Sequence, residues 1–259
     1  GHVTGVQTCA LPICDYPGFG GQGAALAGYN ALTGWPDREP VGPYGTITDS
    51  LAPRFVASAL AAGLHYRRRT GRGVHLDVSQ VECGSWSLAP WLLDYEVDGV
   101  IRERMGNDHP DAALHGVFPC VDEDGIGDRW VAIACWDAAE LDRLHGITGD
   151  DVAAWTVTRT RLEVAERLQA AGLEAVPVQD FGDLHADPQL AHRNHFETHV
   201  HPFLGEGRYG HNGFRIPNCP VGYDRPGPTL GQDNAWVLGE VLGLGADEIA
   251  ALTNQGALE

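Results

Sequence analysis

Residues Arg67–Glu82 read RRRTGRGVHLDVSQVE, and this stretch predicts three elements in a row. The arginines before Gly71 suit the last turn of a helix, because cationic side chains there oppose the negative end of the helix dipole. Apolar side chains then alternate with polar ones through VHLDVS, which is the period of a strand with one buried face. Ser79 and Glu82 have the spacing of a capping box, which opens a helix that we expect to run to about Glu96. The succession of helix, strand and helix favours an α/β fold.

The sequence on the N-terminal side of this stretch predicts two more helices. Residues Gln22–Leu32 are rich in alanine and glycine, and Gly34 and Pro36 stop the pattern. After a loop rich in proline and glycine, apolar residues recur at helical spacing through FVASALAAGLHYRRR. Thr48 or Asp49 is expected to cap this second helix.

The composition changes after Gly99, which indicates a second, smaller α+β domain. Two strands, GVFPCVD and RWVAIACW, are joined by an acidic turn, and EAVPVQ is expected to be a third. Helices are expected at Asp137–Leu144 and Thr160–Ala171, the latter opened by a T-R-L-E capping box. We therefore expect part of a large α/β domain at residues 15–90, the small α+β domain at 91–200, and a return to the large domain at 201–259.

The first fourteen residues differ in character from the rest of the chain. The string VTGVQTCALPI resembles a translated sequencing adaptor, and the segment lacks the basic start and continuous apolar core of a signal peptide. We therefore expect residues 1–14 to be non-native and the natural sequence to resume near Asp15 without its original N-terminus.

Charge and composition argue against several functional classes. The chain of 259 residues contains no lysine and carries a formal net charge of -18, so it repels phosphate backbones and nucleic-acid binding is not expected. No run of 18 apolar residues is present, so no membrane-spanning segment is expected. The six cysteines form no C-x-x-C pair, which favours reduced thiols in the cytoplasm over a disulfide framework.

The segment Gly18–Gly23, GFGGQG, fits the G-x-G-x-x-G pattern of a dinucleotide-binding loop. That function needs a strand before the loop and an acidic residue about 20 positions later, at a strand end. Here a proline precedes the segment, and Asp37 and Glu39 lie in a loop between two prolines. We therefore expect no bound NAD or FAD, and these glycines need another explanation.

Histidines and carboxylates are the remaining candidates for chemistry. Six histidines form the densest titratable cluster: His185, His192, His195, His199, His201 and His211. Spacings of three and four residues suit zinc on a helix, but prolines and glycines interrupt any single helix here, so we expect surface side chains and no metal. Asp49, Asp77 and Glu82 are candidate carboxylates, and each has a structural alternative as a helix cap, a solvated strand residue or a capping-box partner.

The stretch RRRTGRGVHLDVSQVE also resembles the R-x-x-T-G-x-G-x-x-x-D-x-S-x-x-E signature of class III CoA-transferases, the CaiB/BaiF family. The matching residues are Arg67, Thr70, Gly71, Gly73, Asp77, Ser79 and Glu82. Further motifs of the family occur in the same order. L-T-G-W-P-D and T-D precede the signature, and R-x-G-N, H-G-V-F-P-C, D-P-Q-L and P-T-L-G-Q follow it. The resemblance covers the chain from about Asp15 onward.

This resemblance implies a fold, a reaction and partners. Members of the family move CoA between carboxylic acids and combine a Rossmann-like large domain with a small domain, two ring-shaped subunits interlocking as a dimer. It implies CoA thioester as substrate without a bound cofactor, and a homodimer or a heteromer with a related subunit. An aspartate carboxylate attacks the acyl-CoA thioester, giving an acyl–enzyme anhydride and free CoA thiolate. A loop that covers the site corresponds here to Pro110–Gly116, with Asp111, His115 and Gly116 as candidates for contact with CoA.

The catalytic aspartate of the family begins the pattern D-x-x-x-Q-A-x-x-G-x-x-x-x-T-G. Ala25, Gly28, Thr33 and Gly34 match this pattern, but the aspartate position is Gly20. Glycine offers no carboxylate, so three hypotheses stay open: another group such as Asp49 serves, a partner subunit carries the aspartate, or this branch has lost the chemistry. A 2-methylacyl-CoA racemase-like isomerase is a weaker alternative, because it uses the same missing aspartate.

Overall fold

The computed structural model describes residues 18–43, 46–122, 125, 127–219 and 222–258, which fall into two compact units. The first unit ends at Val178, and the second begins at Gln179. The segment interpreted as adaptor-derived lies outside the described residues. The domain bounds expected near residues 90 and 200 stay a prediction.

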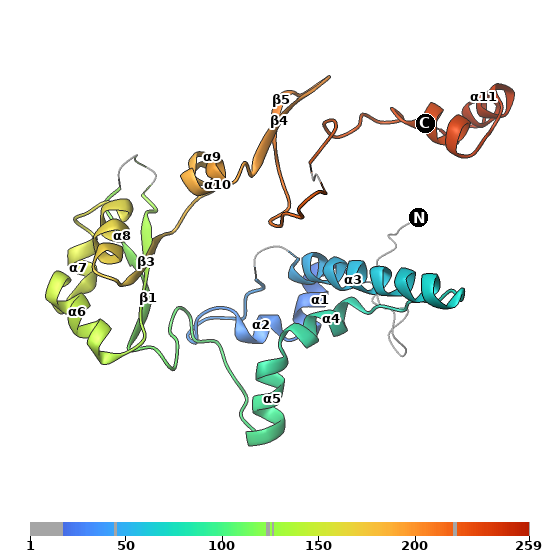
Figure 1. Ribbon diagram of the computed structural model, residues 1–259. Helices are drawn as coiled ribbons and strands as arrows, with labels where there is room; N and C mark the ends of the chain where they lie inside the picture. The colour runs from blue at the N-terminus through green and yellow to red at the C-terminus, as the bar shows by residue number, and fades with distance from the viewer. Residues whose placement is uncertain (1–17, 44–45, 123–124, 126, 220–221, 259) are drawn as a thin grey trace. The chain divides into compact units, whose positions relative to one another are not determined.

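The first unit begins with helices (Figure 1). They are α1 (Gly20–Leu26), α2 (Tyr29–Leu32), α3 (Ile47–Thr70), α4 (Gln80–Ser87) and α5 (Ala89–Asp98). The single helix expected over Gln22–Leu32 is divided into α1 and α2, because Gly28 takes a left-handed conformation with φ at 100°.

The ends of α3 confirm one prediction and correct another. Gly71 stops the helix at φ 71°, its N–H donates to the carbonyl of Arg67 at 2.8 Å, and three arginines occupy the last turn as predicted. The expected cap was wrong, because α3 begins at Ile47 and places Thr48 and Asp49 inside its first turn.

The strand expected in VHLDVS does not form. The described strands pair only among themselves, and residues 73–79 belong to none of them. The apolar side chains of this segment contact α3 instead: Val74 Cγ2 would lie 3.1 Å and Leu76 Cδ1 3.7 Å from a Cβ built on Gly63. A strand depends on hydrogen bonds from a neighbouring strand, so the alternating pattern alone was insufficient.

The helix expected from Gln80 to about Glu96 is also divided. It is interrupted at Leu88, where α4 gives way to α5. Pro90 lies in the first turn of α5, where its missing N–H costs no helical hydrogen bond.

The rest of the first unit is an antiparallel α+β structure, as the sequence predicted. The strands β1 (Leu114–Pro119), β2 (Trp130–Cys135) and β3 (Glu174–Pro177) form a sheet in the order β1-β2-β3, and α6 (Ala138–Thr148), α7 (Val152–Thr156) and α8 (Arg161–Ala170) connect β2 to β3. The predicted capping box opens α8. Glu163 N–H donates to Thr160 Oγ1 at 3.1 Å, and Thr160 N–H donates to Glu163 Oε2 at 3.0 Å.

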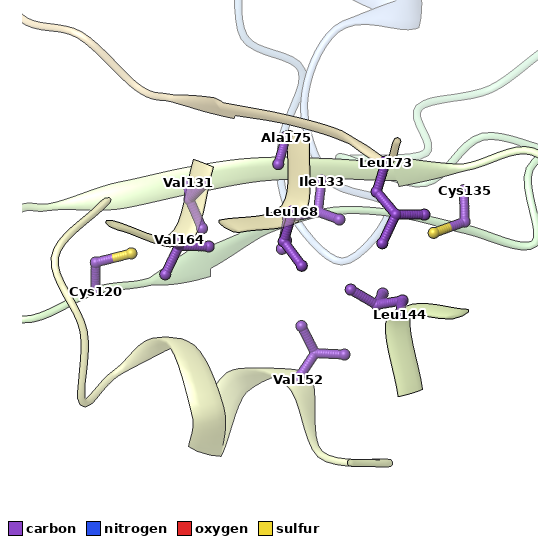
Figure 2. Packing of buried hydrophobic residues seen from close by; sticks show 10 residues of the cluster. All are labelled: Cys120, Val131, Ile133, Cys135, Leu144, Val152, Val164, Leu168, Leu173 and Ala175. Carbon is purple, nitrogen blue, oxygen red and sulfur yellow. The ribbon is translucent and has the colours of Figure 1, made fainter. Parts of the chain in front are cut away.

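A hydrophobic core lies between this sheet and its helices (Figure 2). It consists of Cys120, Val131, Ile133, Cys135, Leu144, Val152, Val164, Leu168, Leu173 and Ala175. Alternate residues of β2 enter the core because strand side chains point to opposite faces in turn. The other alternate set, which includes Ala132 and Ala134, therefore lies on the opposite face of the sheet.

The second unit is built from short elements. They are α9 (Phe181–Ala186), α10 (Pro188–His192), the antiparallel hairpin of β4 (Phe196–His201) and β5 (Gly205–Gly210), the π-helix η1 (Trp236–Val241) and α11 (Ala246–Asn254). The short helix predicted in DPQLAHRN is α10, which Asp187 caps by accepting a hydrogen bond from Leu190 N–H at 2.8 Å. No helix in the described part of the chain is both long and apolar enough to cross a membrane.

Candidate functional site

Three helices of the first unit meet at glycine positions. The helices α1, α3 and α4 approach one another around Thr48, whose side chain is fully buried. A Cβ on Gly23 would lie 2.8 Å from Thr48 Oγ1, and a Cβ on Gly84 would lie 2.8 Å from Ala27 Cβ. Real side chains essentially never come this close, so both glycines permit close helix packing. Part of GFGGQG is thus explained by packing instead of phosphate binding.

Gly20 is the first residue of α1 and faces the beginning of α3. A Cβ on Gly20 would fall within 3.0 Å of Thr46 Cβ and of Asp49 Oδ2. The Cβ of Thr46 is attached directly to the backbone, so relief of this overlap requires the start of α3 to move. The observed packing therefore leaves no room for a side chain at position 20, including the aspartate of the family pattern.

Asp49 brings a carboxylate to the position into which a side chain on Gly20 would project. Its Oδ1 accepts a hydrogen bond from Gln80 Nε2, which also donates to Thr48 Oγ1 at 3.3 Å. Thr48 Oγ1 in turn donates to the carbonyl of Gly20 at 3.4 Å. The positive end of the α3 dipole favours a carboxylate in this first turn. We call Gly20, Thr48, Asp49 and Gln80 the helix corner.

Cys83 is another potential nucleophile close in sequence to Gln80, but its environment opposes that role. Burial raises the pKa of the Cys83 thiol above its ordinary value, and the charge of Glu82 raises it further. A buried thiol of raised pKa is protonated at neutral pH and reacts poorly. The reactive group that the helix corner offers is therefore the carboxylate of Asp49.

The signature residues mainly shape the connection between α3 and α4. Thr70 Oγ1 donates to the carbonyl of Tyr66 at 2.9 Å and accepts from Arg72 N–H at 3.2 Å. Ser79 caps α4 by accepting from Glu82 N–H at 3.2 Å. Within the described ranges, no hydrogen bond or ion pair joins the other signature side chains, such as those of Arg67 and Asp77, to the helix corner.

The candidates for contact with CoA lie at the start of the small sheet. His115 is on β1 and exposed, and its Nδ1 donates to the carbonyl of Asn107 at 2.5 Å. Gly116 follows it and faces the core side of the sheet. Asp111 lies in the preceding loop, where its N–H donates to His109 Nδ1 at 3.3 Å. The structure thus places His115 and Gly116 on one strand but on opposite faces, with Asp111 outside the strand.

Two aromatic rings, those of His109 and Trp136, lie near the ring of His115. Its ring centroid lies 5.9 Å from that of His109 and 6.3 Å from that of Trp136. Trp136 directly follows β2, and its indole N–H donates to Glu174 Oε2 at 3.1 Å. Sequence reasoning missed Trp136 and Glu174, because they meet only when β2 and β3 pair.

In the second unit, Glu197 pairs with two histidines of the cluster. Its two carboxylate oxygens pair with His199 Nε2 at 2.5 Å and with His211 Nε2 at 2.8 Å. These contacts, led by the hydrogen bond from His199, lower the pKa of Glu197. No group of three or more side chains suited to hold a metal ion occurs in the part of the chain that the structure describes. Glu197 carried no motif that would have singled it out in the sequence.

A family model fits most of this chain. The model of CoA-transferase family III matches residues 2–152 and 145–234. The chain belongs to this family. The resemblance inferred from RRRTGRGVHLDVSQVE is thereby confirmed, and so is the fold class. A solved CaiB/BaiF family protein from Brucella suis superimposes with a TM-score of 0.79 at 23% identity, over 90% of this chain and 65% of that protein.

Named relatives of this family III chain are CoA-transferases. The succinyl-CoA–D-citramalate CoA-transferase of Chloroflexus aurantiacus is 29% identical over 93% of the chain, and the chain spans 65% of its length. A probable CoA-transferase of Mycobacterium tuberculosis is 32% identical over 88% of the chain, which covers 29% of that protein. The beta subunit of succinyl-CoA–L-malate CoA-transferase from Chloroflexus aurantiacus is 27% identical over 94% of the chain, which covers 66% of that subunit.

Proposed function

We propose that this chain takes part in CoA transfer between carboxylic acids as a subunit that does not itself supply the nucleophile at position 20. The observation that carries the proposal is the packing around Gly20, where Thr46 and Asp49 fill the space that any side chain at this position would need. Family membership supports CoA transfer, and the names of the relatives support carboxylic acids as donors and acceptors.

The proposed reaction requires a carboxylate with an unhindered oxygen. Attack on the thioester carbonyl forms a mixed anhydride between the enzyme carboxylate and the donor acyl group and releases CoA as its thiolate. The thiolate then attacks the enzyme's own carbonyl in this anhydride, which gives an enzyme–CoA thioester and the free donor acid. The acceptor carboxylate attacks that thioester to form a second anhydride, and the released CoA thiolate attacks the acceptor carbonyl, which gives the new CoA ester and restores the enzyme carboxylate. Gly20 can take no part in bond formation, so the covalent steps require a carboxylate from elsewhere.

A related partner subunit is the source that we favour. Relatives of this chain include proteins named as alpha and beta subunits of one CoA-transferase, which supports an assembly of two related chains. In such a heteromer this chain would support the active partner, and the two would interlock as family dimers do. A homodimer of the same shape is the alternative. Cys83, Cys135 and Cys219 are free thiols in the described part of the chain, which agrees with the reducing cytoplasm that we propose as the location.

Asp49 is the second candidate source of the carboxylate. It is favoured because Oδ2 lies where the side chain of residue 20 would begin. It is disfavoured because Oδ1 is already held by Gln80, and a carboxylate that accepts hydrogen bonds is a weaker nucleophile. If the partner supplies the carboxylate, the Asp49→Asn variant keeps CoA transfer in the mixture. If Asp49 supplies it, the variant loses CoA transfer.

The experiment combines this chain with the product of a neighbouring homologous gene that has aspartate at the position of Gly20. Succinyl-CoA and a panel of carboxylic acids are supplied, and new CoA esters are measured. We expect transfer by the mixture, none by this chain alone, and activity in the mixture that survives Asp49→Asn. Asp142→Asn, the same change at an exposed position on α6, is the matched control. Loss of transfer with Asp49→Asn but not with Asp142→Asn would instead assign the carboxylate to Asp49.

A further inference from the structure

A pocket of about 400 Å³ lies in the second unit, at the end of the β4–β5 hairpin opposite its turn. The pairing of the two strands continues past Phe196 and Gly210, because His211 N–H donates to the carbonyl of His195 at 2.7 Å. Alternate residues of a strand share one face, so His195 and Glu197 lie on the same face of the hairpin as His211. These three residues line the pocket.

Two arginines add positive charge to the lining. Arg193 directly follows α10, and Asn194 then turns the chain into β4 with a left-handed φ of 49°. Arg215 comes from the segment after β5, and its Nη2 donates to the carbonyl of Arg193. This hydrogen bond joins the two segments at the pocket, so two guanidinium groups come from parts of the chain that are 22 positions apart.

Glu197 is the one carboxylate among the described residues that line the pocket, and other side chains already use it. Its Oε2 accepts from His211 Nε2 at 2.8 Å. Its Oε1 accepts from Tyr223 N–H at 2.9 Å and from His199 Nε2. Three of the roughly four lone-pair positions of this carboxylate are thereby occupied. Glu197 therefore has little capacity left to accept a hydrogen bond from a ligand.

The two arginines, in contrast, keep most of their hydrogen-bond donors. Within the described ranges, the guanidinium of Arg193 has no hydrogen-bond or ion-pair partner, and Arg215 uses one donor and forms no ion pair. A guanidinium carries five N–H donors in a planar fork that matches the oxygens of a carboxylate or a phosphate. The unused hydrogen-bonding capacity of the pocket is thus positively charged and donating, which suits an oxyanion.

The formal net charge of -18 opposes an anion anywhere on this chain, but distance limits that effect. Exposed charges more than about 8 Å apart are largely screened at physiological ionic strength. An oxyanion bound by a guanidinium lies only about 2.8 Å from its nitrogens. The arginines that line the pocket therefore outweigh the more distant carboxylates.

The size of the pocket indicates an organic ligand. Its volume of about 400 Å³ falls within the range of about 300–1,000 Å³ that is common for small-molecule sites. An inorganic ion would leave much of this space empty. Phe214 is also part of the lining and offers an apolar contact to the carbon skeleton of a ligand.

We propose that this pocket binds a small organic oxyanion, a molecule with a carboxylate or a phosphate group. The oxyanion accepts hydrogen bonds from the guanidinium groups of Arg193 and Arg215, and the organic part lies against Phe214. Binding here does not depend on CoA transfer, so this site goes beyond the proposed function.

Isothermal titration calorimetry of the whole chain with succinate and with glycerol 2-phosphate tests both kinds of oxyanion. Each anion has an uncharged counterpart, succinamide or glycerol, which should give no saturable binding. We expect saturable binding of at least one anion, and the tighter of the two identifies the oxyanion group that the pocket accepts. Failure of both anions to bind, or equal binding of the uncharged counterparts, would overturn the proposal.

Arg193→Gln locates the binding in this pocket. The variant loses a charged donor, and its affinity for the bound anion is expected to fall at least tenfold. Arg68→Gln is the matched control, because it makes the same change in net charge at an exposed position on α3, and it should alter the affinity less than twofold. Equal weakening in the two variants would assign the effect to overall charge and would overturn the proposal.

Arg215→Gln decides the matter if Arg193→Gln fails to fold. Glutamine keeps an amide donor for the carbonyl of Arg193 but lacks the positive charge, and a loss of affinity of at least threefold is expected. Unchanged affinity would overturn the assignment to this pocket. The titrations involve no turnover, so a chain that binds the oxyanion but supports no CoA transfer in the mixture would contradict the proposed function alone.

Discussion

The two halves of the first unit use their apolar residues in opposite ways. In the α+β half, β1–β3 and α6–α8 bury ten core residues together, and seven of these are no more than 2% exposed. In the helical half, α4 and α5 expose large apolar side chains: Trp86, Trp91, Leu92, Leu93, Tyr95 and Val97. Exposed apolar patches of this kind mark sites of interaction with protein, membrane or ligand. The α+β half therefore encloses its own core, while the helical half leaves large apolar side chains exposed on α4 and α5.

The largest expected effect is the difference in unfolding free energy between substitution of a core leucine and substitution of a surface leucine. Leu168 on α8 is fully buried, so Leu168→Ala should lower the free energy of unfolding by about 2–5 kcal/mol. Leu92 on α5 is 54% exposed, so Leu92→Ala should change it by about 0.5 kcal/mol or less. Urea denaturation of the isolated chain measures both. Equal losses of unfolding free energy in the two variants would show that α5 is covered in the isolated chain. The difference between the two halves would then be wrong.

The second comparison concerns two adjacent glycines of the helical half. Gly20→Ala should destabilise the chain by about 1–3 kcal/mol, because the new Cβ overlaps Thr46 and Asp49. A Cβ on Gly21 would meet nothing within 4 Å, so Gly21→Ala should be neutral or stabilise by about 0.4–1 kcal/mol. Thermal unfolding of the two variants is the measurement. If Gly20→Ala is tolerated as well as Gly21→Ala, position 20 has room for a side chain and the packing argument fails.

A smaller effect tests how local signals stabilise the α+β half. Thr160→Ala removes the capping box of α8 and should cost about 1 kcal/mol, with faster amide exchange in the first turn of the helix. Thr158→Ala, two residues earlier and exposed, is the control and should leave exchange in α8 unchanged. Unchanged exchange in Thr160→Ala would show that packing alone holds this helix end.

The smallest effect concerns Glu197 in the second unit. Its pKa is lowered chiefly by the hydrogen bond from His199, so the folded state is favoured above the ordinary glutamate pKa and that contribution is lost as pH falls through the lowered value. Carboxyl-carbon NMR should report this lowered pKa, and His199→Ala should raise it. His201→Ala removes a histidine of the same strand that makes no described bond to Glu197. A shift in that control equal to that in His199→Ala would contradict the assigned cause.

Local signals in the sequence predicted much of this fold. The capping box at Thr160 and the glycine stop at Gly71 depend on neighbouring residues, and both are present. The three strands predicted for the small sheet are also present. The strand predicted at Val74–Val78 was wrong, because a strand needs a pairing partner and that partner can be distant in sequence.

The candidate site was predicted less completely than the fold. The family pattern identified Gly20 as the position without a nucleophile, and Asp49 was a candidate from the sequence. The roles of Gln80, Trp136 and Glu174 required the structure, because each depends on a contact between residues more than 30 positions apart. No spacing rule in a single sequence reports such contacts.

The central claim is that the helix corner of this chain performs no covalent step. Intact-mass spectrometry of the purified chain after incubation with succinyl-CoA, with and without hydroxylamine, tests it most directly. We predict no acyl adduct, no CoA adduct and no hydroxamate on the protein, while a CoA-transferase that carries the aspartate is labelled in parallel. A stoichiometric adduct on the peptide that contains Asp49, absent from Asp49→Asn, would contradict this account.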